Sequence, residues 1–468
     1  MKMKKKILSV AVLAALGADT AQAVNVSADS TGQVILFPYY TVQGNEETYL
    51  QVVNTTDQGK AVKIRFREAR DSVEVLGFNI YLSPYDVWVG AVVDTADGGA
   101  GIVTKDKSCT VPQLAPGVVQ PFSTLLLPST ATVADTREGH VEIIEMGSIP
   151  VTGVLPLAID ADRDGNADFI HINGVPENCD TFVNNFRGPN SRWDLKPGEG
   201  LANPTGGLFG TLSIINIQSG TQVSVNATSL ESVFDSINHF DPGDNAPTLV
   251  QASPARSFVM VNDGPGGVAQ VYDDDWSSDL FQGGVNAVSA TMMASSVMNG
   301  YSVNPENEAE SAWIVTFPTR WAYSRLADDA PFTGQCEAVT LTTYDREERV
   351  RNNDSVDFSP RPPTSRNSIC HEVNVIQFGA SDVFSADMTE FSIPETSLPG
   401  TKGWLNMVFD EGQQMTSDNG TTFEGLPVIG FKAKVLGNAG IGVGSSYASA
   451  VDHVYTRTVS GTAAYTAP

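Results

Sequence analysis

The chain has 468 residues, of which 41% are hydrophobic and 18% are charged, with 28 Lys and Arg against 54 Asp and Glu. This apolar content excludes a disordered chain. The formal net charge of −26 argues against nucleic acids and anionic membrane surfaces as partners, because the chain repels phosphate groups.

Residues 1–23 have the features of a signal peptide. Lysines precede an apolar run over 7–16, and Ala21, Gln22 and Ala23 have the form of a signal-peptidase site. The run is shorter than the ~20 residues that span a bilayer, and no later stretch approaches that length. We therefore expect an exported protein without a transmembrane segment, at the cell surface or outside the cell, with the periplasm as the alternative.

Segment 24–150 is predicted to form an N-terminal β-sandwich-like domain. Apolar and polar residues alternate over 62–67 and 78–83, which is the period of a strand with one buried and one solvated face. A further strand is expected over 141–145. Short strands separated by turn residues are typical of a sandwich.

Segment 151–305 is predicted to be a mixed middle region. Thr228 and Glu231 have the spacing of a capping box, which predicts a short helix over 229–237. A second helix is expected over 286–298, where Ala, Met and Ser dominate and a glycine follows.

Segment 306–468 returns to strand-like patterns and is predicted to form a C-terminal β-rich domain. The fold class is therefore mainly β, with two or more β-sandwich-like units and a few short helices in the middle region. Trp313 and Trp404 lie in apolar runs and are expected in the core. Trp193 and Trp276 lie in polar segments and are candidates for a ligand surface on which sugar rings stack.

The cysteines are few and even in number, which in an exported chain predicts disulfides. They are Cys109, Cys179, Cys336 and Cys370. Of the three pairings, proximity in the sequence favours the first cysteine with the second and the third with the fourth. Zinc is the alternative, but no pair has the separation of two to four residues that zinc sites use.

An aspartate-rich loop is the strongest chemical signal in the sequence. Oxygen-bearing residues alternate along it around Gly165, and they are Asp160, Asp162, Asp164, Asn166 and Asp168. Alternate residues of a curling loop point inward, so this spacing predicts a site for one Ca²⁺ ion, which takes six to eight oxygen ligands. The alternative is a solvated acidic turn.

The loop departs from a helix-loop-helix calcium site. Its twelfth position is His171, where a bidentate Glu is needed, and the flanking segments are β-like. The loop resembles the strand-loop-strand calcium hairpin of FG-GAP-type repeats, closed by Asp168 and Phe169. That resemblance covers about a dozen residues in a single copy, so it implies an ion site and not a propeller.

Signatures of enzymes are absent from the sequence. The five histidines are scattered and have no zinc spacing, and no nucleophile elbow or phosphate loop occurs. A pair of carboxylates for glycoside hydrolysis is recognised by its separation in space, which the sequence does not show.

Several phrases of the chain resemble a group of secreted proteobacterial proteins known only as cell-surface or hypothetical proteins. These phrases are Val52–Thr55, Phe78–Pro84, Arg137–Gly147, Pro204–Phe209, Trp313–Thr319, Tyr344–Glu348 and Gly425–Phe431. The resemblance spans most of the mature chain and implies residence at the surface or outside the cell, without an activity.

The expected function is accordingly that of a secreted cell-surface or matrix protein with a structural or adhesive role, stabilised by calcium and disulfides. Its expected partners are surface or matrix components, a second copy of the chain or a polysaccharide. The alternative is a secreted hydrolase that acts on a polysaccharide or another polymer with a pair of carboxylates.

Overall fold

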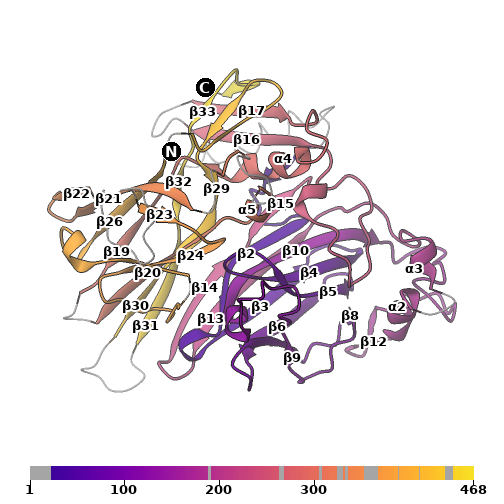
Figure 1. Cartoon of the computed structure of the whole chain (residues 1–468). Coiled ribbons are helices and arrows are strands. Elements are labelled where there is room, and N and C mark those ends of the chain that lie inside the picture. The colour runs from indigo at the N-terminus through magenta and orange to yellow at the C-terminus, as the bar shows by residue number, and fades with distance from the viewer. Residues whose placement is uncertain are drawn as a thin grey trace, which may run out of the picture.

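The computed structural model describes residues 23–187, 191–262, 268–304, 308–323, 330–332, 336–352, 367–387, 389–410, 412–437 and 446–467. The predicted signal peptide lies outside these residues except for Ala23. The fold is mainly β, as predicted. Figure 1 shows the strands of the first half of the chain gathered on one side and those of the second half on the other.

Two antiparallel sheets form the first sandwich. One has the strand order β1-β15-β2-β10-β4-β5-β8, with bounds Asn25–Val26, Thr228–Glu231, Val34–Thr41, Glu138–Ile149, Gly59–Glu68, Glu74–Leu82 and Cys109–Val111. The other has the order β14-β13-β3-β6-β7-β9, with bounds Thr221–Asn226, Leu208–Asn216, Glu46–Asn54, Val87–Asp94, Ala100–Val103 and Gln120–Pro121. Side chains such as Ile64, Trp88 and Leu212 fill one core between these sheets.

Two further sheets form the second sandwich. One has the order β22-β21-β26-β19-β32, with bounds Val350–Asn352, Glu337–Asp345, Lys402–Phe409, Ser296–Ser302 and Val454–Thr456, and β23 (Asn367–Ile369) also pairs with β21. The other has the order β25-β24-β20-β30-β31, with bounds Glu390–Ile393, Val373–Phe378, Ala309–Thr316, Ile429–Leu436 and Tyr447–Asp452. Trp313, Leu405 and Met407 belong to the core of this half.

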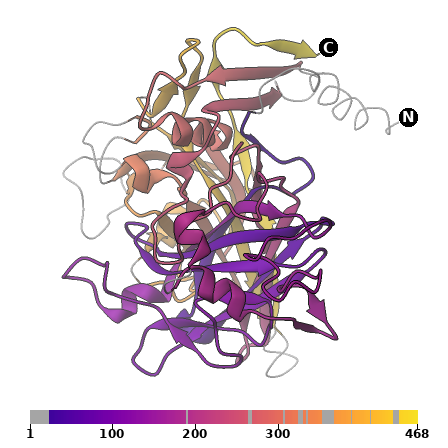
Figure 2. The same cartoon turned by 90° about the vertical axis from the view of Figure 1, so that its right-hand side faces the viewer.

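Small sheets and short helices complete the fold. The sheets are β16-β17-β34 (Arg256–Asn262, Ala269–Asp275, Tyr465–Ala467), β27-β28-β33 (Gln414–Thr416, Thr422–Glu424, Val459–Ser460), β18-β29 (Met293–Ala294, Leu426–Pro427) and β11-β12 (His171–Ile172, Val175–Pro176). The α-helices of the described residues are α2 (Asp180–Asn185), α3 (Arg192–Leu195), α4 (Gly283–Met292) and α5 (Arg320–Tyr323). Short 3-10 turns lie at Gln43–Asn45, Val133–Arg137, Leu249–Gln251 and Glu395–Ser397. Figure 2 shows the C-terminal strand beside β17.

The two sandwiches pack against each other. Antiparallel sheets commonly expose one face to solvent, but here several strands are buried on both faces. Strands β2, β4, β10 and β24 are buried along their whole length. Ile314 and Phe431 of the second half join the core cluster of the first sandwich. The boundaries at 150 and 305 remain predictions. The sheets extend across both positions, because β13, β14 and β15 pair within the first sandwich and β19 pairs with β26 of the second.

Strand β4 differs from the expectation of one solvated face. Its polar face is buried, because the backbone of residues 239–247 covers it. Lys63 Nζ donates to the carbonyl oxygens of Asp241, Pro242 and Asp244 at 2.8–3.1 Å. The Arg65 guanidinium donates to two further carbonyl oxygens of the same segment. The sequence pattern predicts that Lys63 and Arg65 face solvent. In the structure, both side chains instead bind backbone carbonyl groups of a loop that is distant in the sequence.

The predicted helices are corrected in two places. Residues 228–231 form β15 and not the start of a helix, because they pair with β2 on one side and β1 on the other, and sheet hydrogen bonds replace the capping box. The second helix is α4, which ends at Met292, six residues earlier than predicted. The chain then enters β18 and β19, and Gly300 lies within β19.

Candidate metal centre

The aspartate loop lies between β10 and α2, at the edge of the first sandwich. The peptide N–H groups of Ile159 and Asp160 both donate to Pro156 O, at 2.9 and 3.0 Å, which starts the turn. Arg163 and Gly165 have left-handed backbone angles, with φ of 62° and 95°, and these angles curl the chain back on itself. The flanks are less regular than predicted, because residues 155–159 are not a strand and β11 begins only at His171.

Two carboxylates form the buried floor of the loop. Asp160 is 3% exposed and Asp168 is 1% exposed. Asp160 Oδ2 accepts the N–H of Gly165 at 3.0 Å, whereas Asp160 Oδ1 has no hydrogen-bond donor in the described part of the chain. Asp168 Oδ2 accepts the Ala161 N–H at 3.2 Å and the Thr181 hydroxyl, and burial raises the pKa of the Asp168 carboxyl. A buried carboxylate oxygen without a donor is costly, unless a cation neutralises it.

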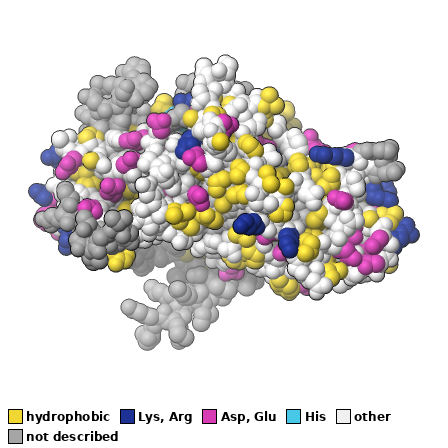
Figure 3. Space-filling model, turned by 90° about the horizontal axis from the view of Figure 1, so that it is seen from below, with side chains coloured by type: hydrophobic (Ala, Val, Ile, Leu, Met, Phe, Trp, Pro, Cys, Tyr) yellow, Lys and Arg dark blue, Asp and Glu magenta, His cyan; other side chains and the backbone are white. Residues whose placement is uncertain are grey.

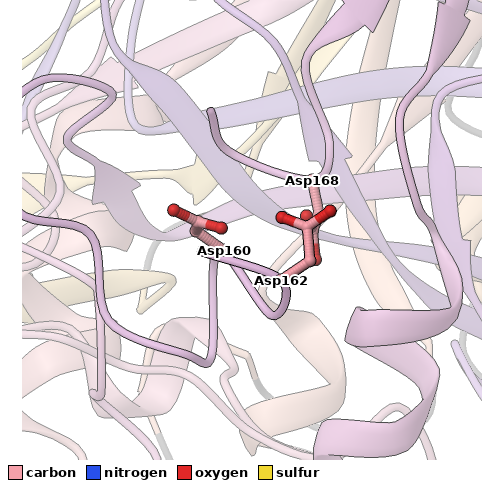
Figure 4. Close-up of side chains that lie close together, drawn as sticks. All are labelled: Asp160, Asp162 and Asp168. Atoms are coloured by element: carbon pink, nitrogen blue, oxygen red, sulfur yellow. The ribbon is translucent and has the colours of Figure 1, made fainter. Parts of the chain in front are cut away.

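Exposed carboxylates form the outer side of the loop. Oxygens of Asp160, Asp162 and Asp168 lie within 4.8 Å of one another, and so do those of Asp162, Asp164 and Glu177. Figure 4 shows Asp162 and Asp168 close together, with Asp160 facing them. Asp162 belongs to both groups, so the loop presents one continuous set of carboxylates.

Glu177 is a member of this set that sequence reasoning missed. It follows β12, and the hairpin of β11 and β12 brings it back to the loop. Partial desolvation by neighbouring parts of the chain and the negative charges of Asp164 and Asp162 raise the pKa of the exposed Glu177 carboxyl. Glu177 lies nine residues after Asp168, so it does not belong to the alternating pattern of the loop. The signal for it in the sequence is the hairpin turn at Asn173 and Gly174, which returns the chain toward the loop.

Asn166 and His171 have supporting positions. The backbone N–H and side-chain amide of Asn166 donate to the two oxygens of Asp164, at 2.7 and 2.9 Å, and these bonds lower the pKa of the Asp164 carboxyl. Asn166 therefore orients a carboxylate through its amide. His171 Nδ1 lies 3.1 Å from Ser83 Oγ and 3.6 Å from Asp86 Oδ2, so this ring nitrogen has partners outside the loop.

A disulfide and an aromatic cluster anchor the loop to the first sandwich. Cys109 and Cys179 form one disulfide, which joins β8 to the residue before α2, and Cys336 and Cys370 form the other, as the predicted pairing has it. Tyr81 of β5 stacks on Trp193 of α3 with ring centroids 5.4 Å apart. The segment after the loop is thus fixed both covalently and by packing.

The tryptophans are distributed differently from the prediction. Trp193 and Trp276, expected on a ligand surface, are 1% and 3% exposed and lie in the core. Trp313 is buried, as predicted. Trp404, expected in the core, is 39% exposed, because strand alternation places Leu405 inward and Trp404 outward.

Charge on the described surface is mixed. On the face shown in Figure 3, the described basic side chains are scattered among acidic and apolar ones. In the described ranges, no helix combines the length and the apolar character needed to cross a bilayer. The two disulfides are compatible with export.

Comparison with known proteins does not place the chain in a family. No family model, no curated protein and no solved structure matches it.

Proposed function

We propose that the protein is an exported, calcium-stabilised β-sandwich protein of the cell surface or the extracellular matrix, with a structural and adhesive role. The observation that carries the calcium assignment is the buried Asp160 carboxylate, whose Oδ1 has no donor among the described residues and which lies within 4.8 Å of Asp162 and Asp168 oxygens. The remainder of the proposal follows from the leader-like residues 1–23, the disulfides and the resemblance to secreted surface proteins.

The chemistry of the donors favours calcium over other cations. The set offers carboxylate oxygens alone, which suits a hard cation, and neither sulfur nor imidazole belongs to it. Asp160, Asp162, Asp164, Asp168 and Glu177 come from a loop and a short hairpin, so the set can adjust to a flexible coordination shell. Mg²⁺ requires stricter octahedral geometry and gives up its water reluctantly.

Calcium would relieve a local repulsion between charges. Five carboxylates lie together in a protein whose formal net charge is already −26. A bound divalent ion replaces their mutual repulsion with attraction, and it stabilises the folded chain by mass action. The ion would thereby hold the covalently anchored loop in one conformation at the edge of the sandwich.

The decisive experiment is thermal unfolding of the mature chain, starting at Val24, in Ca²⁺ and in chelator. Ca²⁺ at a hundredfold excess over its Kd is expected to stabilise the fold by about 2.7 kcal/mol. The double substitution Asp162→Asn and Asp164→Asn should remove this difference, because both side chains are exposed and serve the ion and not the core.

A matched control uses Asp29→Asn with Asp452→Asn, which removes the same charge at two exposed positions, the second of them on β31 of the other sandwich. This variant should keep the full calcium effect. An unchanged melting temperature in chelator would overturn the calcium assignment. Release of new chain ends from a panel of polysaccharides would contradict a purely structural role and favour the hydrolase.

A further inference from the structure

Trp404 forms an exposed aromatic platform on the second sandwich. It lies on the outer face of β26, directly opposite Tyr344 of β21. The two rings stack with centroids 4.2 Å apart and planes 8° apart. This contact covers one face of the indole, yet 39% of Trp404 stays exposed.

The other flank of Trp404 is left open by a glycine. Its direct neighbour on β19 is Gly300, and directly opposed residues of an antiparallel pair share a face of the sheet. A Cβ atom at Gly300 would meet Gly403 O at 3.4 Å and Lys432 Nζ at 3.6 Å, which are ordinary contacts. The backbone therefore does not require glycine here, and the absent side chain leaves room beside the indole.

Cations border this platform. A pocket of about 370 Å³ is lined by Trp404 and Tyr301 together with Lys402, Lys434 and Arg346. Among the described residues, none of these three cations lies within 4.0 Å of a carboxylate oxygen. In a chain with nearly twice as many acidic as basic residues, such a group of unneutralised cations is unusual.

The carboxylate in the pocket does not neutralise them. Asp345 is 6% exposed, and it accepts the N–H groups of Glu347 and Arg349 at 2.9 Å each and pairs with the Arg349 guanidinium. The negative charge of Asp345 is therefore balanced by groups of its own turn, residues 345–349. Lys432, a neighbour of Lys434 on β30, lies behind this pocket, and burial together with the positive charge of Lys434 lowers its pKa.

We propose that this pocket binds an acidic sugar of an anionic polysaccharide, with the Trp404 ring against the sugar ring and Lys402, Lys434 and Arg346 on its carboxylate. An indole offers a flat apolar surface, and ammonium and guanidinium groups form charge-assisted hydrogen bonds with carboxylates. The inference rests on the proposed adhesive role and names its ligand class.

A polysaccharide fits the site better than a nucleic acid does. Proteins that bind single strands use a basic groove that follows the backbone over several nucleotides. Here the platform is a single stacked pair, and the pocket volume is near the lower end of the 300–1,000 Å³ range of small-ligand sites. The geometry accommodates one unit of a polymer at a time.

The test is calorimetric titration of the mature protein in Ca²⁺ with a hyaluronan hexasaccharide, which bears carboxylates on alternate sugars. The uncharged N-acetylglucosamine hexamer and oligo-dT serve as comparison ligands. We expect binding of the acidic hexasaccharide that weakens with salt, and at least tenfold weaker binding of the two others. Equal binding of oligo-dT, or no binding of the acidic sugar, would overturn the proposal.

Variants separate the parts of the pocket. Trp404→Ala, and Lys402→Gln combined with Lys434→Gln, should each weaken binding about tenfold or more. Lys105→Gln with Lys107→Gln, which removes two exposed cations of the first sandwich, should leave binding unchanged. Unaltered binding by the pocket variants would contradict the site.

The variant of the aspartate loop distinguishes the two proposals experimentally. Asp162→Asn with Asp164→Asn leaves the pocket intact and should bind the hexasaccharide like the unaltered protein. Calcium stabilisation without sugar binding would overturn the pocket alone. Sugar binding without calcium stabilisation would overturn the metal site alone.

Discussion

The buried ion pair between Lys60 of β4 and Glu145 of β10 offers a quantitative test of how the first sandwich is held together. Lys60 Nζ lies 2.8 Å from Glu145 Oε1, and neither side chain is exposed. Glu145 also accepts the N–H groups of Thr205 and Gly206, at 3.1 and 2.7 Å, just before β13. The pair therefore joins one sheet to the entry of the other.

The magnitude follows from what each substitution leaves behind. Lys60→Met leaves a buried carboxylate with hydrogen-bond donors but no cation, and it should cost about 3 kcal/mol of unfolding free energy. Glu145→Leu leaves a buried ammonium and two backbone N–H groups without their acceptor, and it should cost about 5 kcal/mol. The double variant keeps only the unpaired N–H groups, so its cost should be smaller than the sum by about 3 kcal/mol.

Urea denaturation of the four proteins in Ca²⁺ measures these differences. The exposed pair of Glu347 and Arg349, whose atoms are 3.4 Å apart, is the control. Glu347→Gln breaks this pair and leaves the pair of Arg349 with Asp345 in place, so it should cost less than about 1 kcal/mol. Additive effects of Lys60→Met and Glu145→Leu, within about 0.5 kcal/mol, would refute the reasoning. In that case the two charges would not depend on each other for their burial.

Two other predictions concern the disulfide beside the loop and the pH dependence of stability. Replacing Cys109 and Cys179 by Ala opens a loop of 70 residues and should cost about 4.4 kcal/mol in the chain-entropy model, measured by urea denaturation; a loss below about 1 kcal/mol would contradict this. Burial raises the pKa of Glu372 to about 8, above its usual value near 4.5, so its folded form retains a proton that the unfolded chain releases. The stability of the fold should therefore decline as pH rises from about 4.5 to 8, by up to about 1.4 kcal/mol per pH unit. Glu372→Gln keeps an acceptor for the backbone N–H of Trp321 and should lack this decline.

Local pattern alone determined much of the fold. The alternation over 62–67 and 78–83 predicted strands β4 and β5, because a period of two is a property of the extended backbone itself. Proximity in the sequence predicted the disulfide pairs, since short loops close most readily. The spacing of the aspartates predicted a compact acidic loop, because side chains two to eight residues apart meet through local turns.

Only the tertiary structure decided what covers each element and which distant residues meet. The polar face of β4 is buried by residues 239–247, and residues 228–231 form a strand because β1 and β2 offer hydrogen bonds on both sides. Glu177 reaches the aspartate loop through a hairpin, and Trp404 is exposed because β26 has solvent on one face. Burial depends on neighbours that are far away in sequence, and a local pattern carries no information about them.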